Sequence, residues 1–178
     1  MQTLTTKSTS KLLTPEQVYK LFFLSLMQPK GNQMKNYVYL AGPMEDCSVD
    51  HMTGWREEAS LRLNLSDIDV LDPTRRVSFH DQLGDNLQNV TKTNNICNRI
   101  FKQDLQDIAH SRIVLADVRR GSGRGTGTSM ELMFAHTKNK IIILWADEED
   151  FVHPFYEAMA TEKHYNLNDA VEAIQEYY

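Results

Sequence analysis

The sequence has few of the residues that mark a disulfide scaffold, a membrane protein or a nucleic-acid-binding protein. Only two of its 178 residues are cysteine, Cys47 and Cys97, which are too few for a disulfide framework and fit no metal-binding spacing. The longest apolar run, within residues 21–27, is far shorter than the ~20 residues that span a bilayer, and no small-residue cleavage site follows it. The 19 basic and 24 acidic residues leave a net charge of −5, without the basic excess that binding to a nucleic-acid polymer requires. These absences predict a soluble, cytoplasmic protein that binds neither membranes nor nucleic-acid polymers.

What is present fits an ordinary globular protein, with 41% apolar and 24% charged residues. Residues 1–35 stand apart, because they carry five lysines against one glutamate. Within them, Thr14-Pro15 begins a helical pattern that extends to about Met27. We therefore expect an N-terminal extension with one helix (1–35) and one main domain (36–178).

From residue 36 onward, strand-like and helix-like segments alternate. Apolar strands are predicted at 37–41, 68–71, 112–116 and 141–145, and helices at 53–65, 98–109, 129–138 and 169–176. This alternation predicts an α/β fold, a doubly wound parallel sheet with helices on both faces. In such sheets ligands bind beyond the carboxyl ends of the strands, which are followed here by Gly42-Pro43, Asp72-Pro73, Asp117 and Ala146-Asp147.

A glycine-rich turn, residues 121–127, follows the third predicted strand. It lacks the GK[ST] ending of a phosphate-binding loop and follows a late strand, so it is not a nucleotide-triphosphate or dinucleotide motif. Backbone N–H groups at the start of the next helix could still hold an anion, with help from Arg119, Arg120 and Arg124. A flexible solvated turn is the alternative.

Glu131 has two interpretations. Thr128-Ser129-Met130-Glu131 fits a capping box, in which the glutamate only satisfies a backbone N–H group. Alternatively, the start of the helix holds an ionised carboxylate beside the ligand-binding edge of the sheet, as a nucleophile for glycosyl transfer requires. Asp104 is predicted to face inward from its helix and Asp107 to face solvent. The histidines show no metal-ligand spacing.

Several short segments follow one another along residues 37–160: Tyr39-Leu40-Ala41-Gly42-Pro43, Trp55-Arg56, Asp104 followed by Ile108, Ala116-Asp117 and Gly127-Thr128-Ser129-Met130-Glu131-Leu132. In this order they resemble the nucleoside 2-deoxyribosyltransferase family. The resemblance implies a flavodoxin-like fold, a homo-oligomer (a dimer or larger), and catalysis without a metal or cofactor. It also implies that the substrates are a nucleoside or nucleotide and a free base.

Carried over position by position, the resemblance gives three residues catalytic roles. Glu131 would attack C1′ and form a covalent deoxyribosyl-enzyme, Tyr39 would orient that carboxylate, and Asp104 would bind and help protonate the leaving base. The long stretch 73–94 is expected to cover the base as a lid. The substrate pocket would be lined by Gly42, Pro43, Arg56, Asp117, Gly127, Thr128 and Ser129.

The sequence also departs from the family pattern. Many of the transferases carry an acidic residue shortly before the nucleophile segment, where this chain has Arg124-Gly125-Thr126. This difference favours a phosphorylated substrate and hence an alternative function, an N-glycosidase that hydrolyses nucleoside 5′-monophosphates. A third hypothesis is a non-enzymatic nucleotide sensor in which Glu131 only caps its helix. Asn166, Asn168 and the carboxyl group of Tyr178 are candidates for contacts across subunits.

Overall fold

The computed structural model describes residues 36–44, 47–75, 94–119, 125–148 and 152–178, all within one unit that spans residues 35–178. Three of the sequence predictions fall outside these ranges: the N-terminal extension with its helix, the lid at 73–94 apart from residues 73–75 and 94, and the start of the glycine-rich turn with Arg120 and Arg124. In the part of the chain that the structure describes, no helix is long and apolar enough to cross a membrane.

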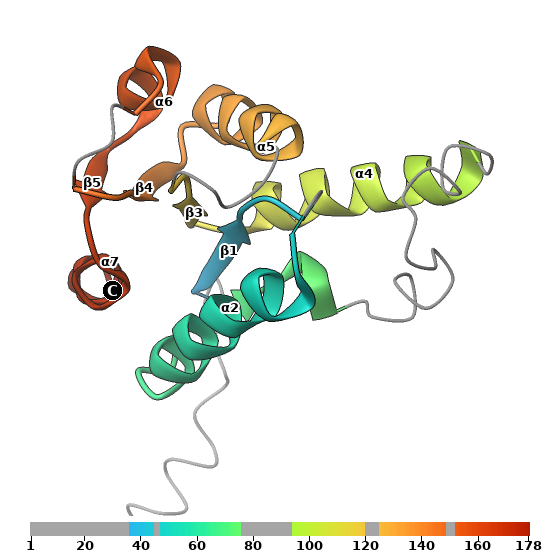
Figure 1. The fold of residues 1–178 in the computed structure, drawn as a ribbon. Coiled ribbons are helices and arrows are strands. Elements are labelled where there is room, and N and C mark those ends of the chain that lie inside the picture. Colours follow the sequence, from blue (N-terminus) through green and yellow to red (C-terminus); the bar gives the residue numbers. More distant parts are fainter. Residues whose placement is uncertain (1–35, 45–46, 76–93, 120–124, 149–151) are drawn as a thin grey trace, which may run out of the picture. The chain divides into compact units, whose positions relative to one another are not determined.

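Five parallel strands form one sheet (Figure 1). They are β1 (Tyr37–Ala41), β2 (Asp69–Leu71), β3 (Ile113–Asp117), β4 (Ile141–Trp145) and β5 (Glu162–His164), in the order β2-β1-β3-β4-β5. This is the flavodoxin-like order, in which the strand order reverses between β1 and β3. The predicted fold class is confirmed.

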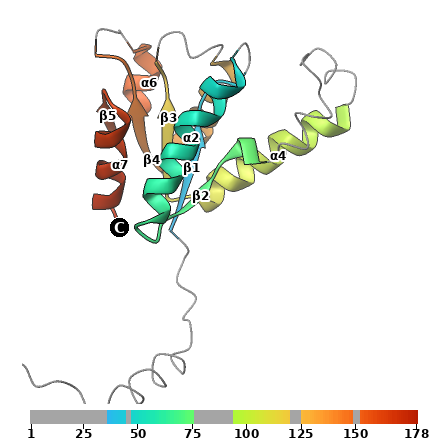
Figure 2. The same cartoon turned by 60° about the horizontal axis from the view of Figure 1, so that its bottom comes forward.

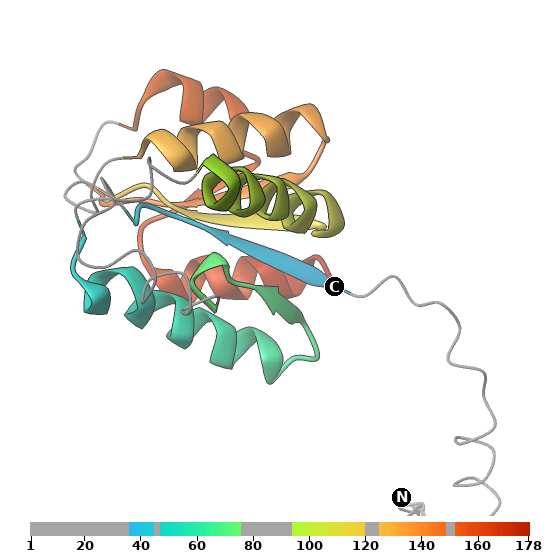
Figure 3. The same ribbon diagram turned by 90° about the vertical axis from the view of Figure 1, so that its right-hand side faces the viewer.

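Helices cover both faces of the sheet (Figure 3). On one face lie α2 (Val49–Asn64) and α7 (Leu167–Glu176), which run side by side in Figure 2. On the other face lie α4 (Asn94–His110), α5 (Thr126–Thr137) and the short α6 (Pro154–Met159). A single 3-10 turn, η1 (Pro73–Arg75), follows β2.

The strands separate two hydrophobic cores because neighbouring side chains of a strand point to opposite faces. Val38 and Leu40 of β1 pack with α2 and α7, whereas Tyr39 and Ala41 pack with α4 and α5. Residues 38–41 of β1 and all of β3 are buried, which explains why these segments are almost uniformly apolar in the sequence. The position of Tyr39 on the α4/α5 side orients its hydroxyl toward the functional residues described below.

Several predicted boundaries are wrong, and two elements were missed. Helix α2 begins at Val49 behind the cap Ser48, and α7 begins at Leu167 behind Asn166 instead of behind Asn168. Helix α5 begins at Thr126, three residues earlier than predicted, after Gly125, which makes no side-chain capping bond. Strand β5 and helix α6 were not predicted, because one has only three polar residues and the other only six residues in all.

Candidate active site

Glu131 lies in the second turn of α5, because it is the sixth residue of a helix that starts at Thr126. A capping-box glutamate occupies the third helical position, so the capping interpretation is wrong. The carboxylate instead reaches the neighbouring strand, where its Oε1 accepts a hydrogen bond of 2.6 Å from the Tyr39 hydroxyl. The bond joins two residues that are 92 positions apart in the sequence.

Tyr39 serves as a fixed donor in this pair. It lies in the middle of β1 and is 0% exposed. Burial and the negative charge of Glu131 raise the pKa of Tyr39 well above its ordinary value of 10.0, with a further contribution from Asp104. The phenol therefore keeps its proton at physiological pH, and through it donates a hydrogen bond to the carboxylate.

Burial raises the pKa of the Glu131 carboxyl group from 4.5 to about 7, and the negative charge of Asp104 adds to this effect. The hydrogen bond from Tyr39 and the positive charge of Arg56 act in the opposite direction. From the sequence we expected a carboxylate held ionised by the helix dipole. The structure corrects this, since burial dominates and favours the neutral carboxyl group.

Asp104 faces the same interior region from α4, as predicted, and is only 8% exposed. Its charge acts on both Tyr39 and Glu131. Asp107, one turn later, was expected in solvent but is also buried, because Arg75 from η1 donates a hydrogen bond of 2.8 Å to its carboxylate. Arg75 stands next to a long irregular segment, so local sequence patterns gave no signal for this pairing.

Gly42 and Pro43 are buried directly after β1. A Cβ atom at position 42 would lie 3.0 Å from both Arg56 Nη2 and Trp55 Cζ2, so any larger residue would have to displace one of these side chains slightly. Arg56 itself is 0% exposed and donates to the carbonyl oxygens of Gly42 (2.8 Å), Leu40 (3.5 Å) and Met52. Its guanidinium group is thus bonded to the protein's own backbone.

Asp117 ends β3 beside Gly42 and is 1% exposed. Both of its carboxylate oxygens accept hydrogen bonds of 2.9 Å from the Arg119 side chain. The Arg119 guanidinium also stacks on the Trp145 ring, 3.5 Å from the ring centroid. Of the three arginines that the sequence analysis assigned to an anion, the one that the structure describes is therefore already paired with a carboxylate.

The residues of the first turn of α5 lie on two different faces of the helix. Gly127 and Thr128 precede Glu131 by four and three positions, which places them on its face of the helix. A side chain added at Gly127 would meet nothing within 4 Å. Thr128 is only 3% exposed, and its hydroxyl oxygen has no hydrogen-bond partner among the residues that the structure describes. Buried polar atoms normally have a partner, so this hydroxyl group is a candidate contact for a bound molecule.

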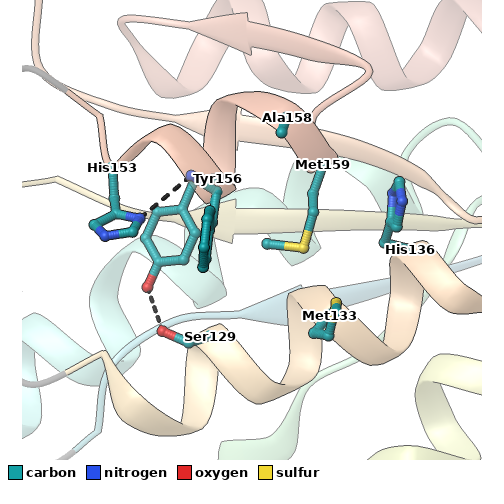
Figure 4. Close-up of a pocket in the computed structure, with 8 residues that line it drawn as sticks. Ser129, Met133, His136, His153, Tyr156, Ala158 and Met159 are labelled. Atoms are coloured by element: carbon teal, nitrogen blue, oxygen red, sulfur yellow. Dashed lines mark hydrogen bonds between the residues drawn. The ribbon is translucent and has the colours of Figure 1, made fainter.

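Ser129 points the other way. Its hydroxyl bonds to the Gly125 carbonyl and to the Tyr156 hydroxyl of α6, at 2.8 and 2.6 Å (Figure 4). With Met133 and His136 of α5 it lines a mostly apolar pocket of about 460 Å³ between α5 and α6. The structure therefore does not bring Ser129 together with Glu131, and the sequence gave no indication of the pocket between α5 and α6.

The remaining candidates lie elsewhere. Asn166 caps α7, and the Tyr178 hydroxyl bonds to the Tyr37 carbonyl at the start of β1, near which the chain ends (Figure 2). Within the described ranges, no three histidine, cysteine, aspartate or glutamate side chains are grouped as a metal site. His153 is engaged locally, because its Nδ1 accepts the Phe155 N–H at the start of α6.

No family model and no curated protein sequence matches this chain. Solved structures do match. A 2-deoxyribosyltransferase of Bacillus psychrosaccharolyticus is 19% identical with a TM-score of 0.54, and the match covers 76% of this chain and 90% of that one. A molybdenum cofactor binding protein of Rippkaea orientalis is 15% identical with a TM-score of 0.50, over 80% of this chain and 97% of that one.

A CMP N-glycosidase of Clostridium botulinum is 13% identical with a TM-score of 0.49, over 78% of this chain and 98% of that one. At these identities the likenesses establish a shared fold. The 2-deoxyribosyltransferase and the molybdenum cofactor binding protein have the same fold, so the chemistry of this chain has to be argued from its own residues.

Proposed function

We propose that this protein is a nucleoside 2-deoxyribosyltransferase that exchanges the base of a 2′-deoxynucleoside without a metal or cofactor, as a homo-oligomer. The observation that carries the proposal is the 2.6 Å hydrogen bond from the buried Tyr39 to a half-buried carboxylate beside the switch point of the sheet. A carboxylate fixed in one position by a neutral donor suits nucleophilic attack on a sugar. The fold shared with a 2-deoxyribosyltransferase supports the same activity.

In the proposed reaction, a carboxylate oxygen of Glu131 forms a bond to C1′ of the deoxyribose while the C1′–N bond to the base breaks. Asp104, in its protonated form, gives its proton to the departing base. The N–H nitrogen of an incoming base then attacks C1′, releases the Glu131 carboxylate and returns its proton to Asp104. Two displacements at the same carbon retain its configuration.

The electrostatics of the site suit this sequence of steps. The burial that raises the pKa of Glu131 also leaves its ionised form poorly solvated and therefore reactive. The phenol of Tyr39 holds the attacking group in place without competing for a proton. The value of kcat/KM, which reports on the free enzyme, should rise with pH through about 7, the pKa of Glu131. Only the ionised carboxylate attacks C1′.

The sugar's 5′ end would lie at the start of α5. Thr128 supplies a buried hydroxyl group without a partner, and Gly127 leaves open space on the same side of the helix. The start of a helix also favours binding of an anion such as a 5′-phosphate. This supports the alternative function, an N-glycosidase that acts on nucleoside 5′-monophosphates. The pairing of Arg119 with Asp117 weakens this alternative, because it occupies one of the positive charges once assigned to the phosphate.

The third hypothesis, a non-enzymatic nucleotide sensor, loses its main argument because Glu131 does not cap its helix. A cofactor-binding protein has the same fold. The assay must therefore be able to show that this protein only binds a ligand and catalyses no reaction.

The test is a base-exchange assay followed by chromatography. Deoxyinosine or thymidine is incubated with free adenine, and in parallel nucleoside 5′-monophosphates are incubated without an acceptor base. The proposal expects a new deoxyadenosine peak in the first reaction. Release of base from the monophosphates alone would support the N-glycosidase instead, and no reaction in either would leave only a binding function.

A further inference from the structure

Arg56 is a fully buried arginine whose place in the proposed site can be derived from its contacts. It comes from the middle of α2, on the face of the sheet opposite to Glu131, and reaches the carboxyl end of β1. There its guanidinium donates to the carbonyl oxygens of Leu40 and Gly42, which stand on either side of the last residue of the strand. With no exposed surface, it has no face left for a substrate.

A buried guanidinium is stable only when opposite charges compensate it. The nearest is Asp72, after β2, whose carboxylate lies 3.7 Å from Arg56 Nε. Asp72 is itself held by the backbone N–H and the hydroxyl of Thr74, at 2.8 Å each. Arg56 therefore connects the ends of β1 and β2 to α2, and it does so at the edge of the sheet where ligands bind.

The charges around Glu131 come from three elements. Tyr39 of β1 donates a hydrogen bond, Asp104 of α4 contributes negative charge, and Arg56 of α2 contributes positive charge. Arg56 in turn interacts with Asp72, Glu131, Tyr39 and Asp117. Among the groups in the described part of the chain that act on Glu131, Arg56 is the one cation.

We propose that Arg56 is a positioning residue of this site: it fixes the turn after β1 and offsets the negative charge gathered there, that of Glu131 included, without contacting the substrate. This inference rests on the proposed function and changes the role that the sequence analysis gave to Arg56, from binding substrate to preparing the nucleophile. A purely structural arginine would hold the same turn but would not influence the protonation of Glu131.

Two substitutions separate charge from hydrogen bonding. Arg56→Gln keeps donors for the backbone carbonyls but removes the charge, whereas Arg56→Lys keeps the charge but loses the planar fork. We expect Arg56→Gln to move the midpoint of the pH profile of kcat/KM to higher pH and to lower kcat/KM at pH 6 about two- to threefold. Arg56→Lys should leave the midpoint near that of the unmodified protein. Arg62→Gln is the matched control, since Arg62 of α2 is partly exposed and pairs with Glu58.

A second measurement needs no change at Arg56 and no catalysis. The Nε–H resonance of Arg56 is followed by NMR as a function of pH, in the unmodified protein and in Glu131→Gln. We expect a transition near pH 7 that disappears in the variant. If the unmodified protein showed no base exchange, the proposed function would be refuted, but the pH titration of the Arg56 resonance could still be observed. An Arg56 resonance that ignores Glu131, or an Arg56→Gln profile with an unchanged midpoint, would overturn the positioning role.

Discussion

The two ends of the sheet share one device and differ in another. At the amino end, Lys140 Nζ donates to the carbonyl oxygens of Ala109 and Ser111 at 2.7 and 2.6 Å, and the Tyr178 hydroxyl bonds to the Tyr37 carbonyl. At the carboxyl end, Arg56 likewise donates to the carbonyl oxygens of Leu40 and Gly42, but there the Glu131 carboxyl group also has a raised pKa, to which the charge of Asp104 contributes.

This difference separates stability from chemistry. Backbone carbonyls that accept hydrogen bonds from the chain's own side chains stabilise the fold and leave nothing for a ligand. Buried carboxylates with a raised pKa cost stability, and proteins keep such groups where they react or bind. Substitutions of Glu131 and Asp104 should therefore change activity strongly and stability little or favourably, and those of the side chains bonded to backbone carbonyls at the amino end should do the reverse.

The largest effect is expected at Glu131. Glu131→Gln keeps the size of the side chain and its ability to accept from Tyr39, but removes the nucleophile, so base exchange should fall at least about 10³-fold. Tyr178→Phe, at the amino end, is the control and should exchange bases at the normal rate. Exchange by Glu131→Gln within a few fold of the unmodified protein would remove the proposed nucleophile.

Asp104→Asn should have the next largest effect, because it removes the group proposed to help protonate the leaving base. A loss of about 10²–10⁴-fold in kcat is expected. Removing the negative charge should also lower the pKa of Glu131, so the rise of kcat/KM with pH should move to lower pH. A pH series on both proteins measures the two effects together, and a shift to higher pH would contradict the assigned electrostatics.

The pH dependence of stability gives a smaller effect that needs no substrate. The folded protein raises the pKa of Glu131 from 4.5 to about 7, so its stability falls as the pH rises through that range and the buried group ionises. Glu131→Gln does not ionise, and it should gain up to about 3 kcal/mol over the unmodified protein at pH 8 but little at pH 4. Denaturant unfolding at both pH values checks this. Equal stability differences at the two pH values would mean that Glu131 titrates normally.

The smallest effect is expected from Tyr178→Phe. This change removes one hydrogen bond of 3.2 Å to the Tyr37 carbonyl and should lower the free energy of unfolding by about 0.5–1.5 kcal/mol. Thermal unfolding measures it. A clear loss of base exchange in this folded variant would break the distinction between the two ends.

The fold could be predicted from the sequence because its central strands are continuous apolar segments. Strands β1 and β4 have the predicted bounds, Tyr37–Ala41 and Ile141–Trp145. The start of α5 was misplaced because the Thr128-to-Glu131 spacing imitates a capping box, while the real start after Gly125 has no capping side chain to announce it. Edge strand β5, with the sequence EKH, has no apolar pattern to detect.

The site was predictable only in part, because its geometry depends on pairs that are distant in the sequence. The residues Tyr39, Asp104 and Glu131 could be named from motifs, and the structure brings them together. Local patterns could not predict three of the observed contacts: Arg56 bonds to backbone carbonyls, Asp107 pairs with Arg75, and Ser129 bonds to Tyr156. The raised pKa of Glu131 likewise follows from burial in the folded protein.

The most direct test of the account looks for the covalent intermediate. The protein is incubated with a deoxynucleoside and no acceptor base, quenched with acid, digested and examined by mass spectrometry. The account predicts a peptide heavier by one deoxyribosyl group, with the group on Glu131, and no such peptide from Glu131→Gln. An adduct on another residue, or base exchange that proceeds with no adduct on Glu131 at any quench time, would contradict it.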